Sequence, residues 1–145
     1  MITTADVSPL AFAGTFAVAI LLVLSFVGVA RFLRREKLLY AAGLTLAAAV
    51  YPILVFAGSY HEKLAIKVTA LLVFSFVAFL GFKWHVRWLA VGWGGHAIWD
   101  VLFPSAPWWY VHGCAVFDFF LAGYIMGGIP AAPSTRATRP TQVIK

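Results

Sequence analysis

Long charge-free apolar runs, separated by short polar segments, make up most of this chain. A helix needs roughly 20 apolar residues to cross the hydrocarbon core of a bilayer. The runs therefore predict five transmembrane helices, at about residues 9–30, 38–58, 64–82, 88–103 and 110–129. We expect an all-α polytopic membrane helix bundle, formed by a single domain over residues 1–130.

The two ends of the chain differ from these runs. The segment MITTADVSPL has no basic stretch ahead of the first apolar run, so we expect that run to be a retained span rather than a cleaved signal peptide. Residues 131–145 are rich in Pro, Ser and Thr, and this composition predicts a disordered cytoplasmic tail.

The composition supports a membrane protein and excludes a soluble domain. Hydrophobic residues make up 63% of the chain and charged residues 11%, whereas soluble domains carry about a quarter charged residues. The single cysteine, Cys114, cannot form an internal disulfide. The chain also lacks a nucleophile elbow, a P-loop and a zinc-protease HExxH motif.

The net charge of +6 is explained by topology. Four basic residues lie between the first and second spans, two between the third and fourth, and three in the tail, which leaves Lys63 and Lys67 on the other side. Because basic residues favour the cytoplasmic side, we expect the N-terminus outside and the C-terminus inside, in a bacterial inner membrane. Lys67 is expected to extend its side chain to the interface.

The expected partner is the lipid bilayer, with some attraction to anionic headgroups. No basic face is left for nucleic acid, so a nucleic-acid-binding function is excluded. A bundle of five helices has little room for an internal channel. We therefore also consider a homo-oligomer or a subunit of a membrane complex.

Polar residues inside the fourth and fifth spans form the one site-like feature. His96 and Asp100 lie four residues apart in GGHAIWD, and Cys114 and Asp118 do the same in the next span, so each pair shares a helix face. The rise of a helix places His96 and Asp118 at a similar depth, roughly 12 Å from the loop between the spans. Asp100, His112 and Cys114 would form a shallower layer.

Burying these groups needs compensation, because an Asp at the centre of a span costs about 2.5–3.5 kcal/mol on insertion scales. The first interpretation is a packing, ligand-binding or partner-binding role, with interhelical His96–Asp118 and Asp100–His112 hydrogen bonds that fix the hairpin. The second is an intramembrane enzyme or proton relay acting on a small or lipid-soluble substrate, with His96, Asp100 and Asp118 as the candidate catalytic residues. Whether the chain is an enzyme stays open.

The third interpretation is a site for a divalent metal such as zinc. The sequence leaves the identity of any other cofactor unknown. The candidate ligands are His96, Asp100, His112, Cys114 and Asp118.

The motifs in these two spans resemble a known family. The HxxWD pattern of His96, Trp99 and Asp100 is followed by a GCxxxD pattern that contains Cys114 and Asp118. Together they resemble a family of small bacterial integral membrane proteins that is described only as a domain of unknown function. The resemblance implies a membrane location and a shared helical hairpin, and it supplies no activity. Relatives often carry a histidine just after WD, where this chain has Phe and Pro, and this departure weighs against a metal centre.

Overall fold

The computed structural model describes residues 8–57, 64–104 and 107–128, and this part of the chain is all-helical, without strands. The expected all-α class is confirmed. The predicted tail at residues 131–145 lies outside the described residues. The described helices are α1 (Pro9–Phe32), α2 (Glu36–Phe56), α3 (Leu64–Lys83), α4 (Arg87–Leu102) and α5 (Trp108–Met126).

Four of these helices, α1, α2, α3 and α5, are long and apolar enough to cross a membrane. The remaining helix, α4, has 16 residues, which corresponds to about 24 Å of helix against a hydrocarbon core of about 30 Å. The structure therefore supports a multi-pass membrane protein with four candidate spans. The fifth span and the orientation in the membrane stay predictions.

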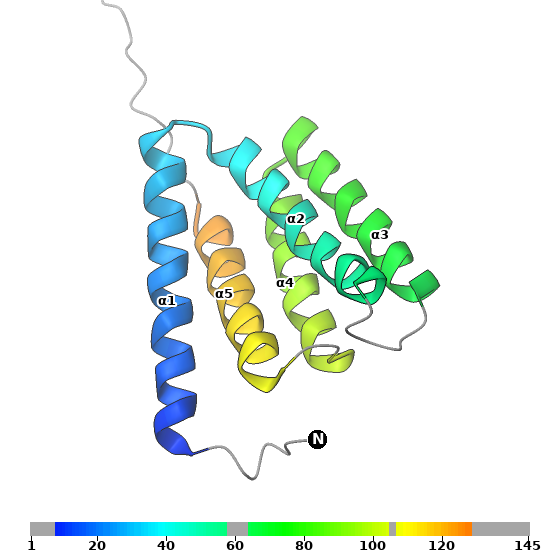
Figure 1. Ribbon diagram of the computed structural model, residues 1–145. Coiled ribbons are helices and arrows are strands. Elements are labelled where there is room, and N and C mark those ends of the chain that lie inside the picture. The colour runs from blue at the N-terminus through cyan, green and yellow to red at the C-terminus, as the bar shows by residue number, and fades with distance from the viewer. Residues whose placement is uncertain (1–7, 58–63, 105–106, 129–145) are drawn as a thin grey trace, which may run out of the picture.

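The helices form a bundle in which neighbours in space differ from neighbours in sequence (Figure 1). Helices α4 and α5 pack as one hairpin, and α2 and α3 pack as another. Helix α3 also packs on α4, and α1 packs mainly on α5. Helices α1 and α2 are consecutive, but Figure 1 shows them separating away from their connecting turn. This separation leaves one side of the α4–α5 hairpin less covered.

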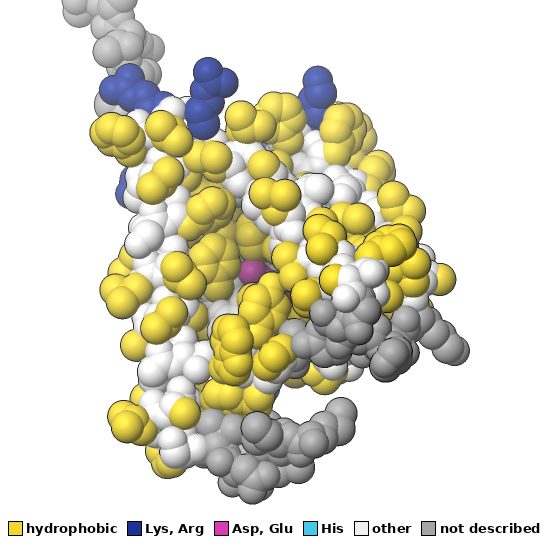
Figure 2. All heavy atoms as spheres, viewed as in Figure 1, with side chains coloured by type: hydrophobic (Ala, Val, Ile, Leu, Met, Phe, Trp, Pro, Cys, Tyr) yellow, Lys and Arg dark blue, Asp and Glu magenta, His cyan; other side chains and the backbone are white. Residues whose placement is uncertain are grey.

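The ends of the bundle differ in charge. The α1–α2 turn, the α3–α4 turn and the end of α5 lie at one end, and Figure 2 shows Lys and Arg side chains gathered there. The α1–α2 turn carries Arg34, which has a left-handed backbone with φ of 54°. At the opposite end of the bundle, Ser8 caps α1 by accepting a hydrogen bond from the amide of Ala11.

Two close approaches fix α4 against its neighbours. The indole Nε1 of Trp93 donates to the backbone carbonyl of Tyr40 at 3.2 Å, which joins α4 to α2. At the α3–α4 corner, Gly81 lies against Leu89, which is fully buried. A Cβ at Gly81 would collide with the Leu89 side chain and lie 2.9 Å from its backbone nitrogen. Glycine is therefore needed at this corner for α4 to start where it does.

Gly81→Ala is expected to destabilise the protein by about 1–3 kcal/mol, the usual cost of overpacking a well-packed site. Gly94→Ala is the control, because its Cβ would lie 3.8 Å from Ala122, an ordinary contact, and it makes the same gain in helix propensity. The measurement is thermal or denaturant unfolding in detergent. Equal stability of the two variants would contradict the close approach at Gly81.

Candidate functional site

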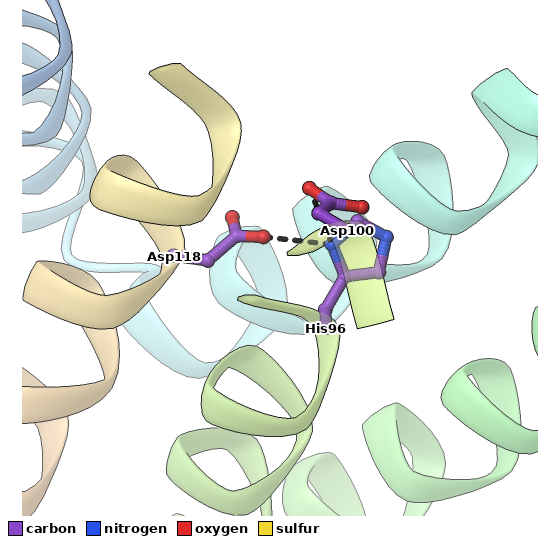
Figure 3. Close-up of side chains that lie close together, drawn as sticks. All are labelled: His96, Asp100 and Asp118. Atoms are coloured by element: carbon purple, nitrogen blue, oxygen red, sulfur yellow. Dashed lines mark hydrogen bonds and ion pairs between the residues drawn. The ribbon is translucent and has the colours of Figure 1, made fainter. Parts of the chain in front are cut away.

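Three polar side chains from α4 and α5 meet inside the bundle (Figure 3). Nδ1 of His96 donates to Oδ2 of Asp118 at 2.7 Å, and the same nitrogen lies 3.6 Å from Oδ2 of Asp100. All three residues are buried, with exposed fractions of 2% or less. The predicted His96–Asp118 contact between the spans is present, and these residues are called the polar cluster below.

Asp100 has a partner that the sequence analysis missed. The hydroxyl of Tyr51 on α2 donates to Oδ1 of Asp100 at 2.8 Å. Tyr51 stands beside Pro52 in an otherwise apolar run. A tyrosine hydroxyl in the middle of a span must find a hydrogen-bond partner. The position of Tyr51 in its span was therefore the feature of the sequence that could have indicated this contact. The polar cluster is thereby tied to a third helix.

The predicted Asp100–His112 hydrogen bond is wrong. His112 donates from Nδ1 to the carbonyl of Trp108 at 3.0 Å and stacks on the Trp108 ring. Six residues separate His112 from Asp118, so the two lie about 120° apart around α5. His112 thus faces away from the polar cluster, whereas Cys114 borders the same hollow as Asp118.

Lys67 on α3 is also placed differently from the prediction. It is 2% exposed, so it does not extend along the lipid-facing surface. Its Nζ lies 3.5 Å from the carbonyl oxygen of Phe103, and 5.1 Å and 5.6 Å from the ring centroids of Tyr51 and Trp99. These contacts place the Lys67 side-chain nitrogen inside the bundle, beside Tyr51, which is the hydrogen-bond donor of Asp100.

The polar cluster borders a hollow of about 240 Å³. Figure 2 shows a carboxylate at the base of an opening in the side of the molecule, surrounded by hydrophobic side chains. Gly43, Ala47 and Tyr51 form a stripe at four-residue spacing on the α2 wall. Ala47 leaves space for the hollow, whereas the rings of Phe26 and Trp93 lie close against Gly43. The remaining lining residues are Phe26, Trp93, His96, Asp100, Tyr110, Cys114, Phe117 and Asp118.

Two buried polar atoms of the polar cluster have no hydrogen-bond partner among the described residues: Nε2 of His96 and Oδ2 of Asp100. A neutral imidazole that donates from Nδ1 leaves Nε2 as a bare acceptor. An imidazolium would instead bury a second N–H with no acceptor, which costs about 1–3 kcal/mol or more. In either form of the ring, Nδ1 of His96 donates to Asp118.

The polar cluster could hold a metal ion, because one ligand atom from each residue lies within 4.8 Å of the others. Of the five predicted ligands, His96, Asp100 and Asp118 come together, Cys114 is a neighbour, and His112 is separate. An ion bound through Nδ1 would place the remaining N–H on Nε2, which lacks an acceptor in the described part of the chain. Metal-bound histidines almost always donate that N–H, so the fit to a metal is incomplete.

Tyr51→Phe is expected to lower stability by about 1–3 kcal/mol, because it leaves Oδ1 of the buried Asp100 without its donor. Tyr124→Phe is the matched control, since the Tyr124 hydroxyl is buried and has no hydrogen-bond partner among the described residues. Its removal should be neutral or stabilising. Unfolding of both variants in the same detergent checks this, and equal losses would argue against the Tyr51–Asp100 bond.

No family model, curated protein or solved structure matches this chain. The resemblance based on the HxxWD and GCxxxD motifs therefore stays a prediction.

Proposed function

We propose that this chain is a small integral membrane protein that binds a small lipid-soluble molecule in the hollow beside the polar cluster. The observation that carries the proposal is the position of His96, Asp100 and Asp118 at the base of an aromatic-lined hollow of about 240 Å³. Ligand pockets combine such apolar walls with a few polar groups that fix orientation. In this proposal the polar cluster holds the polar end of the ligand.

A purely structural role explains less of the geometry. A cluster that only fixes packing has its best arrangement when each buried polar atom is paired. Oδ2 of Asp100 has no hydrogen-bond partner among the described residues, and the hollow beside the polar cluster has the small residue Ala47 on its α2 wall. A bound molecule would fill the space and could pair with Asp118, whose second carboxyl oxygen has no hydrogen bond among the described residues.

A divalent metal is the second candidate, favoured by the spacing of the three ligand atoms. The unpartnered Nε2 of His96 counts against it. Treatment with a chelator distinguishes the two candidate ligands, because it removes a metal and leaves an organic ligand bound.

The expected result is a single small organic adduct on the wild-type protein in native mass spectrometry from membrane-derived nanodiscs, retained after chelator treatment. Asp118→Asn removes a charge and preserves an acceptor for His96, and Ala47→Leu fills the hollow. Both should lose the adduct and remain folded. Ala115→Leu is the control, because Ala115 lies on α5 and borders a different, outward-facing groove.

Two outcomes would contradict the proposal. One is an adduct that survives in both Asp118→Asn and Ala47→Leu. The other is a wild-type chain with no adduct whose melting temperature does not respond to lipid extracts of the host membrane.

We also propose a five-span topology with the basic end of the bundle in the cytoplasm of a bacterium. The gathering of Lys and Arg at one end supports it (Figure 2). The short α4 would then cross with its ends near the two interfaces, where local thinning of the bilayer compensates for its length.

Cysteine labelling tests whether α4 crosses the membrane. In a Cys114→Ser background, His85→Cys precedes α4 and Pro107→Cys follows it. A membrane-impermeant thiol reagent added to intact cells should label the second variant and not the first. Equal labelling of the two positions before cell lysis would show that α4 does not cross.

A further inference from the structure

One oxygen of the polar cluster reaches the hollow. Asp118 accepts from His96 through Oδ2, and its other oxygen, Oδ1, has no hydrogen bond within the described chain (Figure 3). Among the described residues, the fully buried polar atoms without a partner are Nε2 of His96, Oδ2 of Asp100 and the Tyr124 hydroxyl. Oδ1 of Asp118 is unpaired but is not one of these, so it keeps exposed surface. Since Asp118 lines the hollow, a ligand there meets the polar cluster at this oxygen.

The other polar side chains of the lining already interact with protein groups. The hydroxyl of Tyr51 donates to Asp100. Tyr110 and Cys114 lie four residues apart on one face of α5 and interact with each other. The hollow therefore offers a ligand one unpaired oxygen, that of Asp118, among apolar walls.

A hydroxyl group matches this oxygen. A carboxyl oxygen can accept a hydrogen bond whether or not the carboxyl group holds a proton, so a ligand that donates pairs with Oδ1 of Asp118 in either state. A hydroxyl brings one donor, whereas a primary amide brings two N–H groups and a carbonyl. The additional polar groups of an amide would be buried without partners, which is costly.

The walls of the hollow suit an aromatic ligand. The rings of Phe26, Trp93 and Phe117, from α1, α4 and α5, lie with their centroids 5.7 to 6.5 Å apart. Tyr51 and Tyr110 add two further rings to the lining. Aromatic rings at such separations stabilise one another beyond the area that they bury. A ligand ring would extend this packing, whereas a flexible alkyl chain would lose conformational freedom on entering.

The volume limits the size of the ligand. An apolar cavity of about 150 Å³ holds a benzene molecule, so a hollow of about 240 Å³ accommodates one ring and a short substituent. A phenol carries its hydroxyl directly on the ring and so provides both features within this space. The opening lies in the side of the bundle rather than at its charged end (Figure 2), so a ligand dissolved in the bilayer could enter laterally.

From these observations we infer that the hollow binds a small lipophilic phenol. The hydroxyl of the phenol donates to Oδ1 of Asp118, and its ring packs against the aromatic wall of Phe26, Trp93 and Phe117. This inference rests on the proposed function, and it names the chemical class of the ligand.

The experiment compares two probes, 4-propylphenol and 4-propyltoluene, which differ in a hydroxyl against a methyl group of similar size. Binding to the full chain in phosphatidylcholine nanodiscs is measured by equilibrium dialysis. Affinities are expressed against the probe concentration in the lipid of empty nanodiscs, so that the different hydrophobicity of the probes does not enter. The phenol is expected to bind at least about tenfold more tightly, because the methyl group would leave the oxygen of Asp118 buried and unpaired.

Variants locate the effect. In Asp118→Asn the amide oxygen accepts from His96 and the amide nitrogen, which cannot accept, faces the hollow. This variant should weaken phenol binding about tenfold and leave the hydrocarbon within about twofold. Glu36→Gln is the matched control, because it changes an acid to its amide at the first residue of α2, on the basic end of the bundle. It should change neither probe.

Two further variants test the position of the site. Ala47→Leu fills the hollow and should abolish binding of both probes, whereas Ala115→Leu, in the outward-facing groove, should affect neither. Melting curves identify any variant that fails to fold. If Asp118→Asn does not fold, the comparison of the two probes on the wild type and on Ala47→Leu still decides the inference.

The outcomes separate this inference from the proposed function. If the hydrocarbon binds as tightly as the phenol and Ala47→Leu abolishes both, the hollow is a site for apolar molecules and the phenol inference is overturned. A preference for the phenol that survives in folded Asp118→Asn also overturns it. If both probes bind and Ala47→Leu affects neither, the hollow is not the site, and both proposals fail. Absence of binding by either probe overturns the phenol inference, while the native adduct still decides the proposed function.

Discussion

The need to pair buried carboxylates inside an apolar bundle constrains the arrangement of its central helices. Asp118 on α5 is paired by His96 on α4, and Asp100 on α4 is paired by Tyr51 on α2. Hydrogen bonds between membrane helices average only about 0.6 kcal/mol. Their effect is therefore mainly on register, because a shift of one helix would leave a carboxylate unpaired in an apolar setting, at a much larger cost.

The same constraint explains why the bundle leaves a hollow at the polar cluster. Tyr51 reaches across to Asp100, and the stripe that continues from it on α2 consists of Ala47 and Gly43. A Cβ at Gly43 would lie 3.1 Å from the ring of Phe26 and 3.2 Å from that of Trp93. Glycine therefore lets both rings lie against α2, where the indole of Trp93 is fixed by its hydrogen bond to the Tyr40 carbonyl. Polar pairing and aromatic packing thus fix the positions of the residues that line the hollow.

The sequence was sufficient for the features that depend on local pattern. Apolar run lengths predicted the helices to within a few residues, and four-residue spacing predicted that His96 and Asp100 share a face toward α5. Contacts between residues far apart in the sequence were harder to predict from it. Tyr51 lies 49 residues from Asp100, so only the packing of α2 on α4 brings them together.

The errors have a common physical origin. Asp100 and His112 were paired because they lie at similar positions along their helices. His112, however, lies on a face of α5 that is turned away from the polar cluster. Lys67 was assigned to the interface because a long basic side chain near a helix end usually extends there. Instead, the rings of Tyr51 and Trp99 and the end of α4 surround its ammonium. In both cases the sequence did not reveal the direction of the side chain around its helix axis.

The direction of a side chain around its helix axis also distinguishes the hollow beside the polar cluster from the outward groove on the α4–α5 hairpin. The outward groove is larger, about 580 Å³, and is lined by residues such as Phe16, Ile98 and Phe119, with His112 as its titratable side chain among the described residues. Acyl chains of the bilayer match such a surface without specific contacts. The inner hollow is less than half that size, and Asp100 and Asp118 are among its lining residues. Because apolar walls discriminate weakly between ligands and buried polar groups discriminate strongly, the proposed ligand would be recognised more selectively in the smaller hollow than in the groove.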